Sequence, residues 1–132
     1  MHTTTIQVRW GDLDPYNHVN HAVYSSYLEH ARVAALADLA TGMDALTAAG
    51  IQIVVVRSDV RFKAPATAGD DLTVSTSLGE MRGATMTWIQ SITRGGDEIV
   101  EAEVTAACVG GDGRPVRIPG PLRVALATLQ AS

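Results

Sequence analysis

The chain has 132 residues, which allows one domain and leaves little for a second. Its formal net charge is −4 and it contains no run of Lys or Arg, which argues against a nucleic-acid-binding surface. No apolar stretch approaches the ~20 residues of a membrane span, the N-terminus lacks a signal peptide, and Cys108 has no partner for an internal disulfide. We therefore expect a cytoplasmic protein without nucleic-acid or membrane partners, with one domain over 1–132, a core over about 3–118 and a tail at 119–132.

A short strand and one long helix are predicted at the start of the chain. Residues 3–10 alternate between apolar and polar side chains, which is typical of a strand. After an acidic turn, Asn20 is a good N-cap for a helix, and Asn17 is a second candidate. Thr41-Gly42 is predicted to end this helix, with Gly42 as its left-handed cap. Apolar residues recur along it at three- and four-residue steps, as on a buried helix face: Val23, Tyr24, Tyr27, Leu28, Ala31, Ala35 and Leu39.

Four strands are predicted after a connection or broken helical turn at 43–50. The first covers 51–62 and places Val54, Val56, Val60 and Phe62 on one face. Gly95-Gly96-Asp97 is a hairpin signal between the last two strands, and a short helix is expected from Pro119. Short turns force antiparallel pairing, so the sequence predicts an α+β fold in which a curled antiparallel sheet wraps around one helix. The later strands bury alternate residues: Leu72, Val74, Thr76 and Leu78; Met86, Trp88 and Ile92; Val100, Ala102, Val104, Ala106 and Cys108.

Most of the candidate chemistry lies in the turn before the helix. A helix N-terminus exposes unpaired N–H groups and the positive end of the helix dipole. An ionised Asp14 is stabilised there, and so is negative charge that develops on the oxygen of a bound carbonyl. One helix end therefore offers both a carboxylate and an oxyanion hole. The polar residues gathered in this turn are Asp12, Asp14, Asn17, His18, Asn20 and His21.

Each of these residues also has a structural interpretation. Asp14 precedes a proline, and Asp-Pro in a turn often only caps the local backbone. Asp12 is read as a turn residue. His18 and His21 form an H-x-x-H pair that Asp12 or Asp14 could complete as a metal site, but so short a motif is weak evidence, and we expect neither a metal nor a cofactor. Tyr24 and Tyr27 are expected to pack in the core.

The motif D-L-D-P-Y-N-H-V-N-H-A-V-Y-S-S-Y-L-E-H-A-R resembles the entry of the hot-dog-fold acyl-CoA thioesterases, in the 4-hydroxybenzoyl-CoA thioesterase and YbgC-like branch. The segments V-V-V-R-S-D-V-R-F-K-A-P and A-G-D-D-L also resemble that branch, and the resemblance covers roughly residues 5–110. It implies a hot-dog fold, here a five-stranded sheet around one long helix, and an acyl-CoA substrate. It also implies a homodimer or homotetramer with sites at the subunit boundary.

The resemblance assigns roles to individual residues. Asp14 falls on the catalytic carboxylate, and His21 falls on the position whose backbone N–H serves the oxyanion hole. In YbgC-like members a His at that position is itself a catalytic partner, whereas Asn17, His18 and Asn20 are expected to support the turn. Arg82 falls where members contact the nucleotide part of CoA, and Lys63 is a second candidate for the phosphates. The expected function is hydrolysis of an acyl-CoA thioester, and the alternative is a non-catalytic acyl-CoA-binding module.

Overall fold

The computed structural model of the protein describes residues 1–39 and 43–130. The strands lie mainly in the second half of the chain, after the long helix. In chain order the elements are β1 (His2–Gln7), a 3-10 turn η1 (Trp10–Asp12), α1 (His21–Ala37), α2 (Met43–Ala48), β2 (Gln52–Phe62), β3 (Asp71–Met81), β4 (Thr85–Arg94), β5 (Asp97–Val109) and α3 (Gly120–Ala127).

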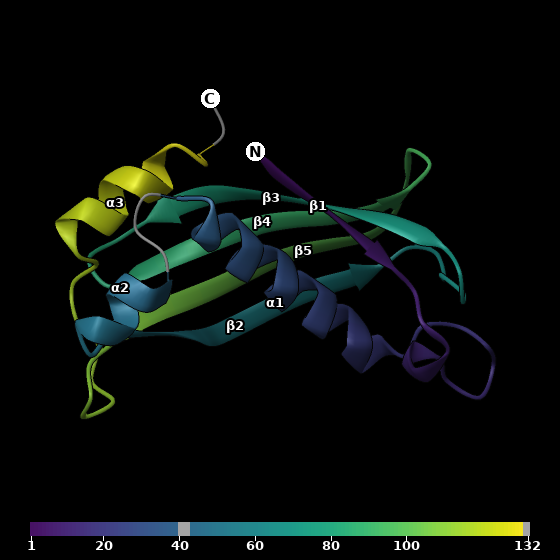
Figure 1. The fold of residues 1–132 in the computed structure, drawn as a ribbon, viewed down its shortest axis with the longest axis horizontal. Coiled ribbons are helices and arrows are strands. Elements are labelled where there is room, and N and C mark those ends of the chain that lie inside the picture. Colours follow the sequence, from purple (N-terminus) through teal and green to yellow (C-terminus); the bar gives the residue numbers. More distant parts are fainter. Residues whose placement is uncertain (40–42, 131–132) are drawn as a thin grey trace.

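The five strands form one antiparallel sheet in the order β1-β3-β4-β5-β2. Helix α1 lies along one face of this sheet, with its N-terminus at the same end as η1 (Figure 1). Helix α3 lies at the opposite end, where β3 turns into β4. The α+β class and the predicted arrangement of a curled sheet around one long helix are therefore confirmed.

Helix α1 begins where the sequence places its cap. The side-chain oxygen of Asn20 accepts a hydrogen bond from Ala22 N at 2.9 Å. The predicted apolar stripe is confirmed at Tyr24, Tyr27, Leu28, Ala31 and Ala35, which are buried, whereas Val23 and Leu39 are only partly buried against the same core. The helix ends at Ala37. The predicted end at Thr41-Gly42 lies outside the described residues.

The first strand is shorter than predicted. It ends at Gln7, and Trp10 begins η1 with 80% of its surface exposed. The chain leaves the sheet here because Arg9 N donates to the side chain of Asp12 at 3.1 Å. The alternating pattern of residues 3–10 therefore extends beyond the strand that it predicts.

A β-bulge in β2 overturns the prediction that Val54, Val56, Val60 and Phe62 share one face. The register shifts between Val55 and Arg57, which adds one residue to β2 relative to β5. On the far side of the bulge Val60 pairs with the buried Ala102, whereas before it Val55 pairs with the buried Ala106. Ile53 before the bulge and Val60 after it are the residues of β2 that pack against the core, so the inward side changes from odd to even positions across the bulge.

The other strands and the C-terminal helix match the sequence pattern. The predicted inward residues of β3, β4 and β5 are buried, and the Gly95-Gly96 hairpin has positive φ angles of 58° and 93°. A short helix is confirmed after Pro119, and its Leu122 and Leu126 belong to the same hydrophobic cluster as α1. None of the described helices is long and apolar enough to cross a membrane.

Candidate active site

The loop between η1 and α1 is a tight, internally bonded turn. Leu13 and Val19 form an antiparallel bridge at its base, and Asp14 N donates to His18 O at 2.7 Å. Asn17 sits at its tip with φ 62°, a left-handed conformation that asparagine tolerates better than most residues. Its carbonyl accepts from Thr67 Oγ1 at 2.8 Å, which ties the loop to the segment before β3.

The two oxygens of the Asp14 carboxylate have different surroundings. Oδ1 accepts from Tyr16 N at 2.8 Å and from His18 N at 3.2 Å. This is the local capping role that an Asp-Pro turn predicts. No hydrogen bond from any described residue reaches Oδ2. Asp14 therefore caps its own loop through one oxygen and keeps the other for a ligand or water.

Asp14 lies at a cavity of about 340 Å³. Its walls come from the loop, the first turn of α1 and the segment that follows β2. The structure thus brings together four of the predicted site residues, Asp14, His18, His21 and Lys63. The full lining is Asp14, His18, Val19, His21, Tyr24, Phe62, Lys63, Ala64 and Pro65.

His21 is the first residue of α1 and contributes to the cavity in two ways. Its ring packs on Phe62 with 4.6 Å between ring centroids. Its backbone N–H donates to no acceptor in the described part of the chain, because the side chain of Asn20 caps Ala22 instead. The first residue of α1 therefore combines an unpaired backbone amide with a place in the lining of the Asp14 cavity.

The opposite wall of the cavity was not predicted. Phe62 ends β2, is 47% exposed and stacks against both His21 and Tyr24, with a centroid distance of 5.7 Å to Tyr24. Tyr24 is buried as predicted, and its hydroxyl accepts from Ala66 N at 3.2 Å. Burial raises the pKa of this phenol, so it stays neutral at physiological pH. An aromatic residue at the end of an otherwise exposed strand is the signal that could have identified Phe62.

The two cations predicted to meet CoA phosphates are both paired with carboxylates. Lys63 Nζ lies 2.5 Å from Glu98 and 2.8 Å from Glu101. The hydrogen bonds to Glu101 and Glu98 raise the pKa of this ammonium group. Arg82 Nε lies 3.2 Å from Glu80 on an exposed hairpin. Exposed pairs of this kind are weak, so a phosphate can compete for Arg82.

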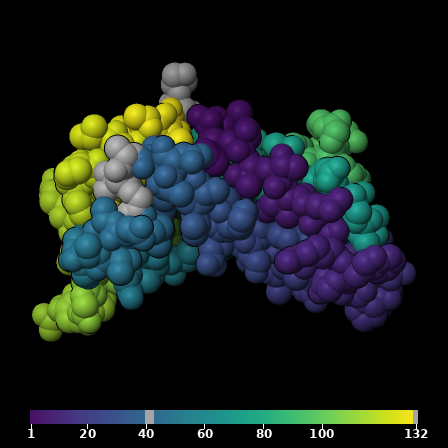
Figure 2. Space-filling model, in the orientation of Figure 1, coloured from purple at the N-terminus to yellow at the C-terminus, as the bar shows by residue number. Residues whose placement is uncertain are grey.

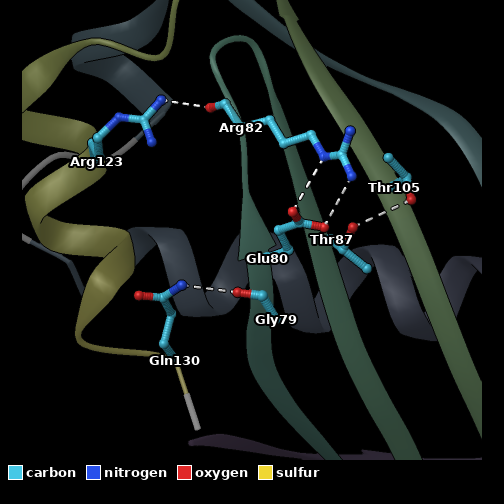
Figure 3. Close-up of polar contacts among 7 residues, drawn as sticks. All are labelled: Gly79, Glu80, Arg82, Thr87, Thr105, Arg123 and Gln130. Atoms are coloured by element: carbon cyan, nitrogen blue, oxygen red, sulfur yellow. Dashed lines mark hydrogen bonds and ion pairs between the residues drawn. The ribbon is translucent and has the colours of Figure 1, made fainter.

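Arg82 lies far from Asp14 within one chain. It sits in the turn between β3 and β4, where Arg123 of α3 donates to its carbonyl oxygen at 2.6 Å (Figure 3). A second contact joins the C-terminal segment to β3, because Gln130 donates a hydrogen bond to Gly79 O at 2.9 Å. The loop that carries Asp14 and the C-terminal helix occupy opposite ends of the molecule (Figure 2). The structure therefore does not bring Arg82 to the Asp14 cavity of its own chain.

His18 and His21 both line the cavity, but a metal site is not assembled around them. Among residues 1–39 and 43–130, no group of three or more His, Cys, Asp or Glu side chains is placed to hold a metal ion. The polar side chains that the cavity offers include the Asp14 carboxylate, the imidazoles of His18 and His21 and the Lys63 ammonium group.

Comparisons with known proteins agree with this geometry. Residues 8–126 match the family model described as the thioesterase-like superfamily. The chain is 34% identical to the long-chain acyl-CoA thioesterase FadM of Escherichia coli, over 80% of this chain and 81% of FadM. It is 32% identical to the E. coli acyl-CoA thioester hydrolase YbgC, over 79% of this chain and 78% of YbgC.

A solved thioesterase from Thermus thermophilus, complexed with coenzyme A and Zn, has the same fold. It superposes with a TM-score of 0.85 and 27% identity, over 97% of this chain and 92% of that one. The family resemblance found in the sequence is thus confirmed by sequence and by fold. The chain belongs to the thioesterase-like superfamily.

Proposed function

We propose that the protein is an acyl-CoA thioesterase that hydrolyses an acyl-CoA to the free acid and CoA. The observation that carries the proposal is that Asp14, with one carboxylate oxygen free, lines a cavity together with His21, whose backbone N–H is unpaired in the described structure. Membership of the superfamily and the names of FadM and YbgC support the same substrate class.

In the proposed reaction the thioester carbonyl oxygen accepts a hydrogen bond from His21 N–H at the positive end of α1. Negative charge that develops on this oxygen is stabilised there. Asp14 acts through Oδ2, either as a general base on water or as a nucleophile that forms a mixed anhydride. The C–S bond then breaks and CoA leaves as a thiolate. A thiol pKa of about 8.5 makes this possible without a strong acid. In the nucleophilic route, water then hydrolyses the anhydride, which releases the acid and restores the Asp14 carboxylate.

The neighbouring side chains have supporting roles in this proposal. The imidazole of His21 lies against Phe62 in the cavity and orients the water or the carboxylate. Asn20 caps the helix, so that the His21 amide remains free. Asn17 and His18 hold the loop through their backbone contacts to Thr67 and Asp14. Arg82 is assigned to the nucleotide part of CoA, and Lys63 is retained as a weaker candidate because two carboxylates already neutralise it.

We also propose that the protein works as a homodimer, or as a tetramer of such dimers, in the cytoplasm. Strand β2 is at the edge of the sheet and exposes Val55 and Val56 to 50% and 59%. An exposed apolar edge strand is a pairing surface for a second chain. The loop that carries Asp14 is hydrogen-bonded to Thr67 just before β3, and Arg82 directly follows β3, so a second copy can bring an Arg82 to each Asp14 cavity. The single Cys108 fits a reducing compartment.

The proposal is tested by measuring thiol release from a panel of short, long and aromatic acyl-CoAs. We expect turnover of at least one substrate, and Asp14→Asn to lower its rate by about 100-fold or more, the size typical of the loss of a general base. Full activity of Asp14→Asn would remove Asp14 from the mechanism. Thermal stabilisation by acyl-CoAs without turnover would instead show the non-catalytic binding module.

A further inference from the structure

A buried hydrogen bond joins the loop to the middle of α1. Tyr27 donates its hydroxyl to Asp12 Oδ2 at 2.6 Å, and the two residues are only 5% and 8% exposed. Asp12 Oδ2 also accepts from Arg9 N at 3.1 Å, and Arg9 Nε lies 3.7 Å away. Asp12 is therefore more than a turn residue, and Tyr27 has a polar role in addition to core packing.

The charge of Asp12 is retained despite its burial. Burial alone raises the pKa of this carboxyl, but hydrogen bonds from Tyr27 and Arg9 outweigh it and the net shift is downward. Burial, together with the bond to Asp12, raises the pKa of the Tyr27 phenol. The pair is thus a neutral phenol donating to a buried carboxylate, a type of hydrogen bond that is short and strong.

Asp12 contacts α1 at two separated points. Its carboxylate holds Tyr27, and its carbonyl oxygen accepts from Asn20 N, the cap of the helix, at 2.9 Å. Asp14 follows two residues after Asp12, and His21 follows Asn20 directly. The position of Asp12 therefore constrains both groups of the proposed site. The Asp14 carboxylate is two residues away along the chain, and the His21 amide follows Asn20, which is hydrogen-bonded to Asp12.

Neither Asp12 nor Tyr27 contributes to the Asp14 cavity. They line a separate cavity of about 560 Å³ between β1 and α1, together with Arg9 and His30. A substrate in the Asp14 cavity therefore does not touch them, and any effect on the reaction must pass through the position of the loop.

We propose that Asp12 and Tyr27 are a positioning pair that sets the Asp14 carboxylate against the His21 N–H. This inference rests on the proposed function, and it adds two residues that act without contacting substrate. Without the pair, Asp12 keeps only its backbone bond from Asn20 N to the start of α1, so one of its two links to the helix is lost and the loop can shift relative to the helix. Misplacement by about 1 Å is enough to cost on the order of 100-fold in rate.

The test compares Tyr27→Phe with Thr76→Val. Thr76 is fully buried in β3, and its Oγ1 accepts from Gln90 Nε2 at 3.1 Å. Each substitution removes one buried side-chain hydrogen bond and nearly preserves shape, and in each case the former partner keeps another bond. We expect both variants to lose stability, and Tyr27→Phe to lose more, because its bond is made to a charged carboxylate. Only Tyr27→Phe should lower kcat, by about 10- to 100-fold with KM little changed, because binding groups stay in place.

Substitutions of Asp12 provide a graded check. Asp12→Asn keeps an oxygen that accepts from Tyr27, so it should retain more kcat than Asp12→Ala or Tyr27→Phe. If the kcat of Tyr27→Phe equals the kcat of Thr76→Val, the Asp12–Tyr27 pair has no positioning role. The same conclusion follows if Asp12→Asn is no more active than Asp12→Ala. If Asp12→Ala does not fold, the comparison of Tyr27→Phe with Thr76→Val still decides.

A measurement without turnover separates this inference from the proposed function. In an NMR spectrum, Tyr27→Phe should shift the His21 amide and the Asp14 carboxyl signals, and Thr76→Val should leave both unchanged. If the wild-type protein hydrolyses no acyl-CoA, the proposed function fails, while these shifts still report on the geometry. If both signals stay unchanged in Tyr27→Phe, the positioning pair is refuted whatever the activity.

Discussion

The two oxygens of Asp14 predict that its loop-capping and catalytic roles can be separated by mutation. Oδ1 accepts two backbone N–H bonds, from Tyr16 and His18, whereas Oδ2 accepts none from the described residues, and Asp14 lines the cavity. Asp14→Asn keeps an oxygen for the loop but removes the charge. Asp14→Ala removes both. At about 1 kcal/mol for each of two partly exposed hydrogen bonds, Asp14→Ala should lose about 2 kcal/mol of unfolding free energy, and Asp14→Asn less than about 1 kcal/mol.

Both variants should lose at least about 100-fold in thioester hydrolysis, because neither has a carboxylate. Urea denaturation gives the free energy of unfolding, and thiol release gives the rate. Asp112 is the matched control, because its Oδ1 accepts from Arg114 N at 3.0 Å in an exposed turn. Asp112→Ala should reduce stability without reducing the rate. The reasoning is refuted if Asp14→Ala is as stable as Asp14→Asn, or if Asp14→Asn keeps its activity.

Three further predictions concern other parts of the molecule. Leu122→Ala in α3 should lower the free energy of unfolding by about 2–5 kcal/mol, because Leu122 is fully buried. Urea denaturation measures this loss, and a loss below about 1 kcal/mol would show that α3 is not part of the core. Hydrogen bonds from Thr67 N and Arg94 outweigh burial and lower the pKa of Asp70. The ionised Asp70 therefore stabilises the fold at any pH above 3.8, the ordinary pKa of this group. This stabilisation is lost as the pH falls through the lower pKa that Asp70 has in the folded protein. The stability difference between wild type and Arg94→Met should therefore shrink between about pH 5 and about pH 2, and a constant difference would contradict this assignment. Hydrolysis should survive EDTA, whereas a loss that one metal restores would establish a metal site at His18 and His21.

The sheet and the long helix were predictable because their patterns are local. Alternation in β3, β4 and β5 and the stripe on α1 follow directly from which side of each element is buried. The bulge at Val56 was not predictable, because a run of valines satisfies either register and the pairing with β5 decides between them. The end of β1 was mispredicted for a similar reason. Trp10 continues the apolar alternation of the strand, and its residue type does not reveal that it is exposed in a turn.

The candidate site was predictable where its residues are close in sequence. Asp14 and His21 lie on one turn and one helix end, so their proximity follows from local geometry. Phe62 was missed because only the sheet topology places the end of β2 against the first turn of α1. The Asp12–Tyr27 bond was missed for a related reason. A tyrosine on a buried stripe predicts that its hydroxyl needs a partner, but not which carboxylate supplies it.

The separation of Arg82 from Asp14 has a consequence for mixtures of inactive variants. The loop that carries Asp14 is hydrogen-bonded to Thr67 just before β3, and Arg82 directly follows β3, so this strand of 11 residues, roughly 35 Å long, separates the two regions. If each working site combines Asp14 of one subunit with Arg82 of its partner, a hybrid of Asp14→Asn and Arg82→Met chains retains one intact site. Co-expressing the two crippled chains should then restore activity that neither has alone, as in complementation between alleles of a single gene.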